Sequence, residues 1–363
     1  MKILVLNAGR FLSPEGGAVR FKNLVVNRRP CEEVYWIDPA YSRATYDDDE
    51  VEKSVAKNVF ITKGFKTSSN PLVELWQREK HFLNAAKRFG RECDVAVCYN
   101  SWGTFLARRW LKRCGVPLVF DYTDLMHAFR KGIQRVVSRW SVSQALEQAD
   151  FVFTTAQALS EDAARHNKNV ELVPNGVDMN FYSQARQKKL AHPNAGFVGG
   201  IGEWVDAESI AETAFALQKT RFYFVGDGPK RGLLEARALP NLEVTGLVPH
   251  AEARDWAAGF DACLIPFLQN ELTDAVCPIK LFEYWALGKP VVSAPLREVK
   301  RITGDAVLYA STPREWRDAV SEVLEDDNVA RELSEKGKRV VKDYDWKKLG
   351  EKYFSKLEAL ARK

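Results

Sequence analysis

Short apolar segments rich in β-branched residues alternate with amphipathic segments along nearly the whole 363-residue chain. In the first half these runs occupy residues 3–7, 34–38, 59–62, 95–99, 118–122, 151–155 and 170–173, and in the second half residues 196–199, 222–225, 242–245, 262–266, 291–294 and 307–309. Runs that are apolar on both faces and separated by helices predict parallel strands between two helical layers. Because the pattern occurs twice, we expect an α/β protein of two doubly wound, Rossmann-like domains.

The two halves of this pattern meet at a turn-forming segment. Pro174-Asn175-Gly176 ends the last run of the first half, and Asn-Gly is a strong turn signal. Residues 183–193 are polar and show no strand pattern, which suits a surface crossing between domains. We therefore expect one domain over residues 1–178 and a second over residues 179–343. Residues 314–342 predict two helices broken at Asp326-Asp327-Asn328, and residues 346–360 predict a further amphipathic helix.

The net charge of +5 is unevenly distributed. Residues 1–180 carry 26 Lys and Arg against 21 Asp and Glu, whereas residues 181–363 carry 27 of each. Much of the excess lies in Arg108, Arg109, Lys112, Arg113, Arg130, Lys131, Arg135 and Arg139. One interpretation is a solvated helix face; the other is a surface that meets anionic phospholipid or a phosphate-bearing acceptor. We expect no nucleic-acid partner, because no recognisable nucleic-acid-binding module surrounds these residues.

Neither a membrane span nor a metal centre is expected from the sequence. No apolar run reaches the roughly 18–20 residues that cross a bilayer, and the first run is too short for a signal peptide. The six cysteines form no C-x-x-C pair or Cys/His cluster, which fits a reducing compartment. The acidic run at residues 47–50 suits a solvated loop better than a metal site. We expect a cytoplasmic protein, in peripheral contact with the inner face of the membrane if the basic surface meets lipid, and no metal or other cofactor.

Five motifs follow one another in the second half of the chain: VPNGVD at 173–178, GFVGGI at 196–201, VGDGP at 225–229, VTGLVP at 244–249 and PIKLFEYWALGKPVV at 278–292. In this order and spacing they resemble the glycosyltransferase family 4-like group of GT-B enzymes. The stretch GEWVD at 202–206 is similar to the transferases of surface-polysaccharide synthesis. The resemblance implies two Rossmann-like domains facing a central cleft, with the first domain on the acceptor side, the second binding the donor, and residues 344–363 returning to the first domain. It also implies a hexosyl-type transfer from a UDP- or GDP-sugar to a glycan or lipid-linked acceptor, without a bound metal.

One departure from the family concerns its paired glutamates. Many members carry two glutamates eight positions apart, the second of them at the position of Glu283. Eight positions before Glu283 stands Ala275, and the nearby Glu271 and Asp274 are out of register. The role of the first glutamate is therefore absent or displaced.

Residues Pro278, Lys280 and Glu283 match the P-x-K-x-x-E subgroup, in which the resemblance gives the lysine contact with the donor diphosphate. A proline before a helix that begins near Ile279 suits the first helical position. Lys280 would then lie in the first turn, where the helix dipole and fixed N–H donors stabilise a departing diphosphate. Glu283, one turn further, could accept hydrogen bonds from the ribose hydroxyls. The alternative for Glu283 is an ordinary solvated helix glutamate.

Several glycine-containing loops follow predicted strands. Gly199 and Gly200 would approach the donor diphosphate or sugar, and Gly226 would lie beside the nucleobase, with Leu247 and Val248 at its border, as the resemblance implies. Gly16 and Gly17, in a loop that is not G-x-G-x-x-G, would lie near the diphosphate and the acceptor. For the glycine loops, ordinary βα turns fit the same residues.

Three titratable residues close the run at 118–122. An inverting transferase needs a general base at the carboxyl ends of its strands, and Asp124 is the first candidate, followed by Asp121 and His127. A retaining transferase needs none, because the leaving phosphate can take the proton, and His127 could then bind the donor sugar. Asp124 could instead cap a helix over residues 125–129. The stereochemistry stays open.

Two other functions fit the same architecture. A nucleotide-sugar 2-epimerase would need acids, bases and histidines around the sugar, and this chain has five histidines in all. A non-catalytic nucleotide-sugar-binding partner subunit is the other alternative, and Ala275 in place of the usual glutamate is the residue that favours it.

Overall fold

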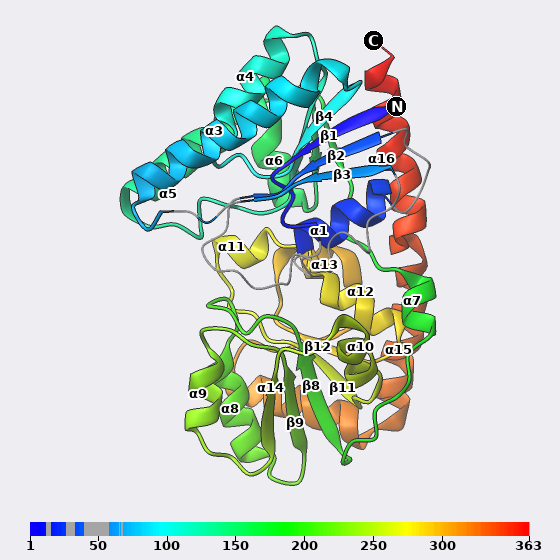
Figure 1. Ribbon diagram of the computed structural model, residues 1–363. Coiled ribbons are helices and arrows are strands. Elements are labelled where there is room, and N and C mark those ends of the chain that lie inside the picture. The colour runs from blue at the N-terminus through cyan, green and yellow to red at the C-terminus, as the bar shows by residue number, and fades with distance from the viewer. Residues whose placement is uncertain (12–15, 27–32, 40–57, 65, 67, 363) are drawn as a thin grey trace. The chain divides into compact units, whose positions relative to one another are not determined.

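The computed structural model describes residues 1–11, 16–26, 33–39, 58–64, 66 and 68–362 (Figure 1). The chain divides into two compact units. Unit 1 comprises Met1–Pro174 together with Lys347–Lys363, and unit 2 comprises Asn175–Trp346. Each unit is built on one sheet whose described pairs are all parallel, so the predicted α/β class is confirmed.

The sheet of unit 1 has the strand order β3-β2-β1-β4-β5-β6-β7. Its strands are β1 Lys2–Leu6, β2 Glu33–Ile37, β3 Val59–Thr62, β4 Val95–Cys98, β5 Leu118–Tyr122, β6 Phe151–Thr154 and β7 Val170–Leu172. The chain builds outward from β1 through β2 and β3, then returns and builds from β4 in the other direction. The direction of winding therefore reverses between β1 and β4, which is where doubly wound sheets open a crevice at the carboxyl ends of their strands.

The helices of unit 1 connect these strands and cover the sheet. They are α1 Gly16–Phe21, α3 Pro71–Phe89, α4 Phe105–Arg113, α5 Gly132–Gln148, α6 Gln157–Ala164 and all but the first residue of α16 Trp346–Ala361, with a π-helical turn at Lys22–Val26. The start of α3 is set by Asn70, whose side chain accepts hydrogen bonds from the N–H groups of Leu72 and Val73. Tyr353 of α16 stacks on Phe153 of β6 with ring centroids 4.0 Å apart, which fixes α16 on unit 1.

The sheet of unit 2 has the order β10-β9-β8-β11-β12-β13. Its strands are β8 Asn194–Val198, β9 Arg221–Val225, β10 Leu242–Gly246, β11 Ala262–Ile265, β12 Val291–Ser293 and β13 Leu308–Tyr309. The helices are α7 Met179–Ser183, α8 Ala207–Ala216, α9 Arg231–Ala236, α10 His250–Ala258, α11 Glu271–Asp274, α12 Ile279–Ala286, α13 Arg297–Thr303, α14 Pro313–Glu325 and α15 Asp327–Val341. Here the winding reverses between β8 and β11.

The predicted break within residues 314–342 is confirmed at Asp326. This residue ends α14, and its side chain accepts hydrogen bonds from Asn328 and Val329 at the start of α15. The packing of α15 on α12 depends on a glycine, because a Cβ added at Gly337 would lie 2.2 Å from Cδ1 of the buried Trp285. Helix α12, which carries Lys280 and Glu283, is thereby fixed from its outer side.

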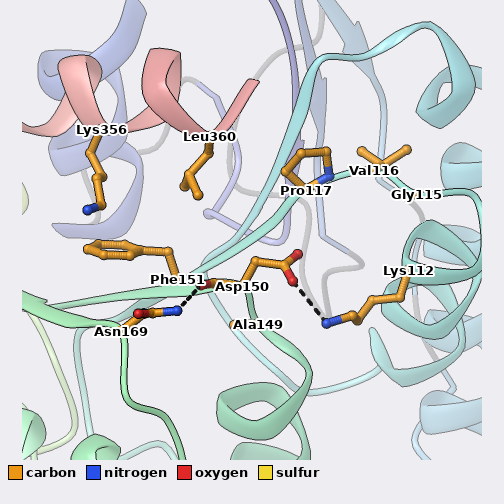
Figure 2. Close-up of a pocket in the computed structure, with 10 residues that line it drawn as sticks. All are labelled: Lys112, Gly115, Val116, Pro117, Ala149, Asp150, Phe151, Asn169, Lys356 and Leu360. Carbon is orange, nitrogen blue, oxygen red and sulfur yellow. Dashed lines mark hydrogen bonds and ion pairs between the residues drawn. The ribbon is translucent and has the colours of Figure 1, made fainter. Parts of the chain in front are cut away.

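None of the helices in the described part of the chain is both long and apolar enough to cross a membrane. Unit 1 has a hollow of about 560 Å³ before the amino ends of β5, β6 and β7, beside α16 (Figure 2). On its wall, Lys112 Nζ lies 3.0 Å from Asp150 Oδ1, and Asn169 donates to the carbonyl of Asp150 at 3.0 Å. Apart from Lys112 of the predicted basic surface, its lining contains none of the residues predicted to bind donor or acceptor, since those follow the opposite, carboxyl ends of the strands or lie on α12.

Candidate functional site

Lys280 and Glu283 form an ion pair on α12. Lys280 Nζ donates to Glu283 Oε2 at 3.1 Å, across one helical turn. Pro278 occupies the cap before α12 and not the predicted first helical position, because the helix begins at Ile279. Lys280 is therefore the second residue of the helix, in the first turn as predicted, where the N–H groups lack partners within the helix.

Glu283 is 8% exposed and surrounded by groups that favour its charged form. Burial alone would raise its pKa, but Lys280, His250 and Tyr182 together outweigh burial and lower the pKa to about 2. His250 Nε2 lies 3.9 Å from Oε1 of the carboxylate and 3.5 Å from the hydroxyl of Tyr182. Glu283 is thus an ionised acceptor of hydrogen bonds throughout the neutral pH range.

Sequence reasoning did not single out His250 and Tyr182. Tyr182 lies in α7, just after the turn between the two halves, and is buried, whereas His250 begins α10 and is half exposed. The ring of His250 stacks on Phe181 with centroids 4.8 Å apart, which holds the imidazole beside Glu283. A signal for His250 was present, because it directly follows the VTGLVP motif, but no local pattern links Tyr182 to a residue 101 positions away.

Gly199 and Gly226 lie where two loops of unit 2 cross. The N–H of Gly199 donates to the carbonyl of Val225 at 2.9 Å, and a Cβ added at Gly226 would lie 1.9 Å from the carbonyl oxygen of Gly199. Their φ angles of 149° and 151° also favour glycine. A Cβ at Gly199 would approach Cε of Lys280 to 3.0 Å, so this loop lies against the lysine, whereas Gly226 is required by the crossing itself.

The remaining donor-side residues follow β8 and β10. Gly200 comes directly after Gly199, and a Cβ there would reach Trp204 only at 3.7 Å. Leu247 is 77% exposed, and Val248 is partly buried against the core of unit 2. The predicted donor residues Gly199, Gly200, Gly226, Leu247, Val248, Lys280 and Glu283 therefore follow the carboxyl ends of β8, β9 and β10 or lie on α12, in unit 2, whereas Gly16 and Gly17 belong to unit 1.

The residues around the missing first glutamate are engaged elsewhere. Ala275 is 1% exposed at the end of α11. Asp274 Oδ1 accepts a hydrogen bond from the N–H of Arg297 at 3.0 Å, which caps the start of α13. A buried alanine has no polar side chain to offer a ligand. Of the two positions of the family's glutamate pair, only that of Glu283 therefore carries a carboxylate.

In unit 1, Asp121 takes part in a buried network. Its two oxygens accept hydrogen bonds from Nε and Nη2 of Arg20 at 3.0 and 3.1 Å, and Tyr353 donates to Oδ2 at 3.4 Å. The Arg20 and Asp121 side chains are 1% and 0% exposed. Arg20 also donates to the carbonyl of Pro174 at 2.9 Å. The network joins α1, β5, α16 and Pro174, the last residue of the first segment of unit 1. Both oxygens of Asp121 are already engaged.

Asp124 is half-buried after β5 and accepts a hydrogen bond from the hydroxyl of Thr123 at 3.3 Å. Burial raises its pKa; Thr123 and Arg20 oppose this rise, and the charge of Asp121 adds to it. The alternative that Asp124 caps a helix is wrong, because residues 125–129 form turns. A carboxylate with a raised pKa and no helix to cap has the properties of a candidate base.

His127 and Gly17 also lie in unit 1. His127 is 5% exposed in the turn after Asp124. Gly17 lies in α1 against Tyr99, which follows β4, and a Cβ there would come within 2.7 Å of the tyrosine ring. This contact gives Gly17 a packing role. Gly16 is the first residue of α1, and Ser13, Pro14 and Glu15 of the predicted loop lie outside the described residues.

Asn7 is a further residue that sequence reasoning missed. It has a φ of 61°, an uncommon value for a residue other than glycine, at the end of β1. Its side-chain amide donates to the carbonyls of Asn100 and Trp102 at 3.1 Å each. Asn7 therefore ties together the loops that follow β1 and β4, on the two sides of the point where the winding reverses.

Arg108 corrects the predicted basic surface. It is 0% exposed on the inner side of α4, whereas the other seven residues of that set are exposed or half-buried. Burial lowers the pKa of its guanidinium. Among the residues that the structure describes, no group of three or more His, Cys, Asp or Glu side chains could hold a metal ion.

Two family models match the chain. Residues 67–176 match a model described as a glycosyl transferase 4-like domain, and residues 192–326 match one described as glycosyl transferases group 1. The glycosyltransferase TuaH of Bacillus subtilis, named for teichuronic acid biosynthesis, is 25% identical over 315 residues, which cover 78% of this chain and 77% of TuaH. The 2-deoxystreptamine glucosyltransferase of Streptomyces kanamyceticus is 27% identical over 237 residues, which cover 59% of this chain and 60% of that enzyme.

Solved glycosyltransferase structures share the fold. Sucrose-phosphate synthase of Thermosynechococcus elongatus superposes with a TM-score of 0.79 at 14% identity, covering 99% of this chain and 98% of that one. HepE of Anabaena, solved with UDP-glucose, gives a TM-score of 0.76 at 15% identity over 99% and 100% of the two chains. The predicted GT-B architecture is thereby confirmed, and together with the two family models it identifies the chain as a member of the family 4-like group of GT-B glycosyltransferases.

Proposed function

We propose that this glycosyltransferase takes its sugar from a UDP- or GDP-sugar, whose diphosphate binds at Lys280, and transfers it to a glycan or lipid-linked acceptor. The observation that carries the proposal is the Lys280–Glu283 pair, held beside the Gly199 loop at the carboxyl edge of the unit 2 sheet. Ligands of doubly wound sheets bind at this edge.

Lys280 is suited to a departing diphosphate. Its ammonium has three N–H donors, of which Glu283 takes one at 3.1 Å. Its side chain is 28% exposed, so the other donors remain open to a phosphate oxygen. The start of α12 adds unpaired backbone N–H groups and the positive end of the helix dipole. Charge that grows on the diphosphate as the sugar leaves would be stabilised by these fixed donors.

Glu283 supplies the complementary function. As an ionised carboxylate, Glu283 accepts hydrogen bonds and donates none. The two hydroxyls of a ribose can donate hydrogen bonds to such an acceptor. Tyr182 and His250 fix the orientation of the carboxylate. In this proposal Gly200 borders the sugar, while Gly226, Leu247 and Val248 lie on the side of the nucleobase.

Uracil is the base we favour. HepE of Anabaena, which shares the fold, was solved with UDP-glucose, and this supports UDP over GDP. The name of TuaH supports a polysaccharide as acceptor. In unit 1 we assign the acceptor side: Asp124 is the base if transfer inverts the anomeric centre, and His127 and the start of α1 at Gly16 and Gly17 contact the substrates. Asp121 is a positioning residue whose oxygens are held by Arg20.

A thermal-shift screen against UDP, GDP, ADP and their sugar conjugates tests the donor assignment. A ligand at 100 times its dissociation constant stabilises a protein by about 2.7 kcal/mol, which is readily measured. We expect a shift with uridine nucleotides, lost in Glu283→Gln and Lys280→Met. Glu335→Gln is the matched control, because Glu335 forms the same type of pair with Lys338 at 2.8 Å on the exposed face of α15. A shift that is unchanged in Glu283→Gln would refute the site, and a guanosine-only response would refute the choice of base.

A further inference from the structure

Most of the large apolar side chains exposed by the described residues lie in one part of unit 1. Their exposed fractions run from 42% at Val73 to 79% at Leu72. We call them the apolar patch, and they are Leu72, Val73, Trp76, Leu106, Phe129, Ile133, Val136 and Trp140. In the described residues of unit 2 this class contains Phe215, Leu247 and Leu268, which belong to separate elements or loops. The patch is therefore a local feature and not a general property of the chain.

The patch residues are brought together by contacts among α3, α4 and α5, which lie together in the cyan part of unit 1 (Figure 1). The carboxylate of Glu79 on α3 accepts hydrogen bonds from the N–H groups of Phe105 and Leu106 at 3.0 and 2.8 Å, fixing the start of α4. The ring of Phe105 lies 5.1 Å from that of Trp140 on α5. The start of α4, which carries Leu106, therefore lies beside α5 although 35 positions separate Phe105 from Trp140.

Within each helix the exposed apolar residues also share one face. On α5, Ile133, Val136 and Trp140 follow the spacing i, i+3, i+7, and on α3, Leu72 and Trp76 are four apart. These side chains point outward, since the inner face of α5 is formed by small and buried residues such as Ser141 and Ala145. Helices α3 and α5 thus each present an apolar stripe with no described partner layer over it, and α4 adds Leu106.

The surroundings of the patch are positively charged. The exposed basic residues of segments 71–80, 105–113 and 129–142 are Lys80, Arg109, Lys112, Arg113, Lys131, Arg135 and Arg139, of which Lys112 pairs with Asp150 at 3.0 Å. The acidic residues of segments 71–80, 105–113 and 129–142 are Glu74 and Glu79, both half-buried. Glu74 pairs with Arg78 at 2.7 Å, and Glu79 caps α4. No exposed carboxylate in these described segments offsets the positive charge.

We propose that the apolar patch is a docking surface for a lipid bilayer with anionic headgroups. Trp76 and Trp140 carry amphipathic rings of the kind that settle at the boundary between headgroups and acyl chains. Lys and Arg around them can extend their charges to the lipid phosphates while the aliphatic stems cover apolar surface. Amphipathic helices with this composition lie in the plane of the interface. Three of the seven exposed basic residues are lysines, a residue type that is depleted at packed protein interfaces.

Docking would deepen the proposed function, because a lipid-linked acceptor is presented at a membrane surface. The role that we give to docking rests on the proposed function, but lipid binding itself requires neither donor nor acceptor. The two proposals can therefore fail separately, and the same protein preparations can test both.

The test is co-sedimentation of the full chain with vesicles of phosphatidylcholine alone or mixed with phosphatidylglycerol. We expect binding to the anionic vesicles only, weakened by salt. Ile133→Ser with Val136→Ser removes apolar contact, and Lys131→Glu with Arg139→Glu reverses charge. Each charge reversal should weaken partitioning about fivefold or more. The matched control is Phe215→Ser with Lys219→Glu, which changes one exposed apolar and one exposed basic residue of unit 2.

Circular dichroism and the thermal shift with UDP-sugar establish that each variant is folded and binds donor. The inference is overturned if the wild-type protein ignores anionic vesicles, if both patch variants bind as the wild type does, or if the unit 2 control loses binding to the same extent. A wild-type protein that shows the donor shift but does not bind anionic vesicles would refute the docking surface alone. A missing donor shift with intact vesicle binding would refute the donor site alone.

Discussion

The two units have the same order of strand winding. They differ in the groups that hold together the loops at the carboxyl ends of their strands. In unit 2 the edge is formed by backbone, where the Gly199 and Gly226 loops cross without room for a side chain. In unit 1 the edge is held by side chains, in particular by Asn7 across the winding reversal and by Arg20 on Asp121. The difference indicates that unit 2 offers one fixed shape, whereas unit 1 depends on residues that substitution can alter independently.

The two buried carboxylates make the same contrast. Asp121 has both oxygens taken by Arg20 and is 0% exposed. Glu283 pairs with a lysine through one oxygen, retains a 10% exposed side chain and faces Tyr182 and His250. A carboxylate that is fully paired stabilises a fold, and one that keeps accepting capacity near the surface can also bind a ligand. The following substitutions test this distinction.

The largest effect is expected from Arg20→Met. The substitution leaves Asp121 buried without its partner, which costs about 3–5 kcal/mol. Urea denaturation measures the change in the free energy of unfolding. Lys112→Met is the control, because it breaks a pair with Asp150 in which both side chains are 40% exposed, and we expect a cost below about 1 kcal/mol. Equal costs for the two variants would contradict a special role for the buried network.

Gly226→Ala should follow. The new methyl group would lie 1.9 Å from the Gly199 oxygen at a φ of 151°, so the loops must separate, at a cost of roughly 3 kcal/mol. Donor binding should be lost with the loop crossing, as measured by the UDP-sugar thermal shift. In Gly232→Ala, where nothing lies within 4 Å, stability should stay unchanged or rise by about 0.4–1 kcal/mol. A donor response that survives in Gly226→Ala would show that the crossing is not needed.

Glu283 should contribute to the pH dependence of the free energy of unfolding. Its pKa falls from an ordinary 4.5 to about 2 on folding, so the stabilisation is present above pH 4.5 and is lost as the pH falls toward 2. We expect a contribution of roughly 2–3 kcal/mol. In Glu283→Gln the acid limb of the stability curve should flatten over this range, as followed by urea denaturation at each pH. An unchanged acid limb would mean that the carboxylate is not held in its ionised form by Lys280, His250 and Tyr182.

The last effect is expected in a rate profile and not in stability. If Asp124 is the general base, its raised pKa keeps the carboxyl protonated above its ordinary pKa of 3.8, so kcat/KM should rise with pH through a midpoint above that value. Asp124→Asn should remove this limb and lower the rate by roughly 10²–10⁴-fold. Asp124→Glu should restore part of the rate and part of the acid limb. A pH profile without an acid limb, with a wild-type rate in Asp124→Asn, would favour a retaining mechanism without a protein base.

The fold, and the placement of Lys280 beside Glu283 that the proposed donor site uses, could be predicted from local patterns. Strands and helices follow from runs and periodicities within a few residues, and Lys280 and Glu283 are three positions apart on one helix. Partners far apart in sequence could not be predicted: Arg20 meets Asp121 across 101 positions, and Tyr182 meets Glu283 across the same separation. Arg108 shows a second limit. An arginine in a basic helix predicts exposure, and only the packing of α4 shows that its guanidinium is buried.

Connectivity adds a constraint on how the molecule is made. The chain enters unit 2 at Asn175 and leaves it at Trp346, and the entering and leaving segments are joined by hydrogen bonds from Val177 to Tyr344 and from Trp346 to Val177, of 2.9 and 3.0 Å. During synthesis, all residues of unit 2 are therefore joined to the chain before residues 347–363 are. Unit 1, although its first strand is made first, waits for the end of the chain to supply Tyr353 to Asp121 and Phe153. The unit that begins first finishes last.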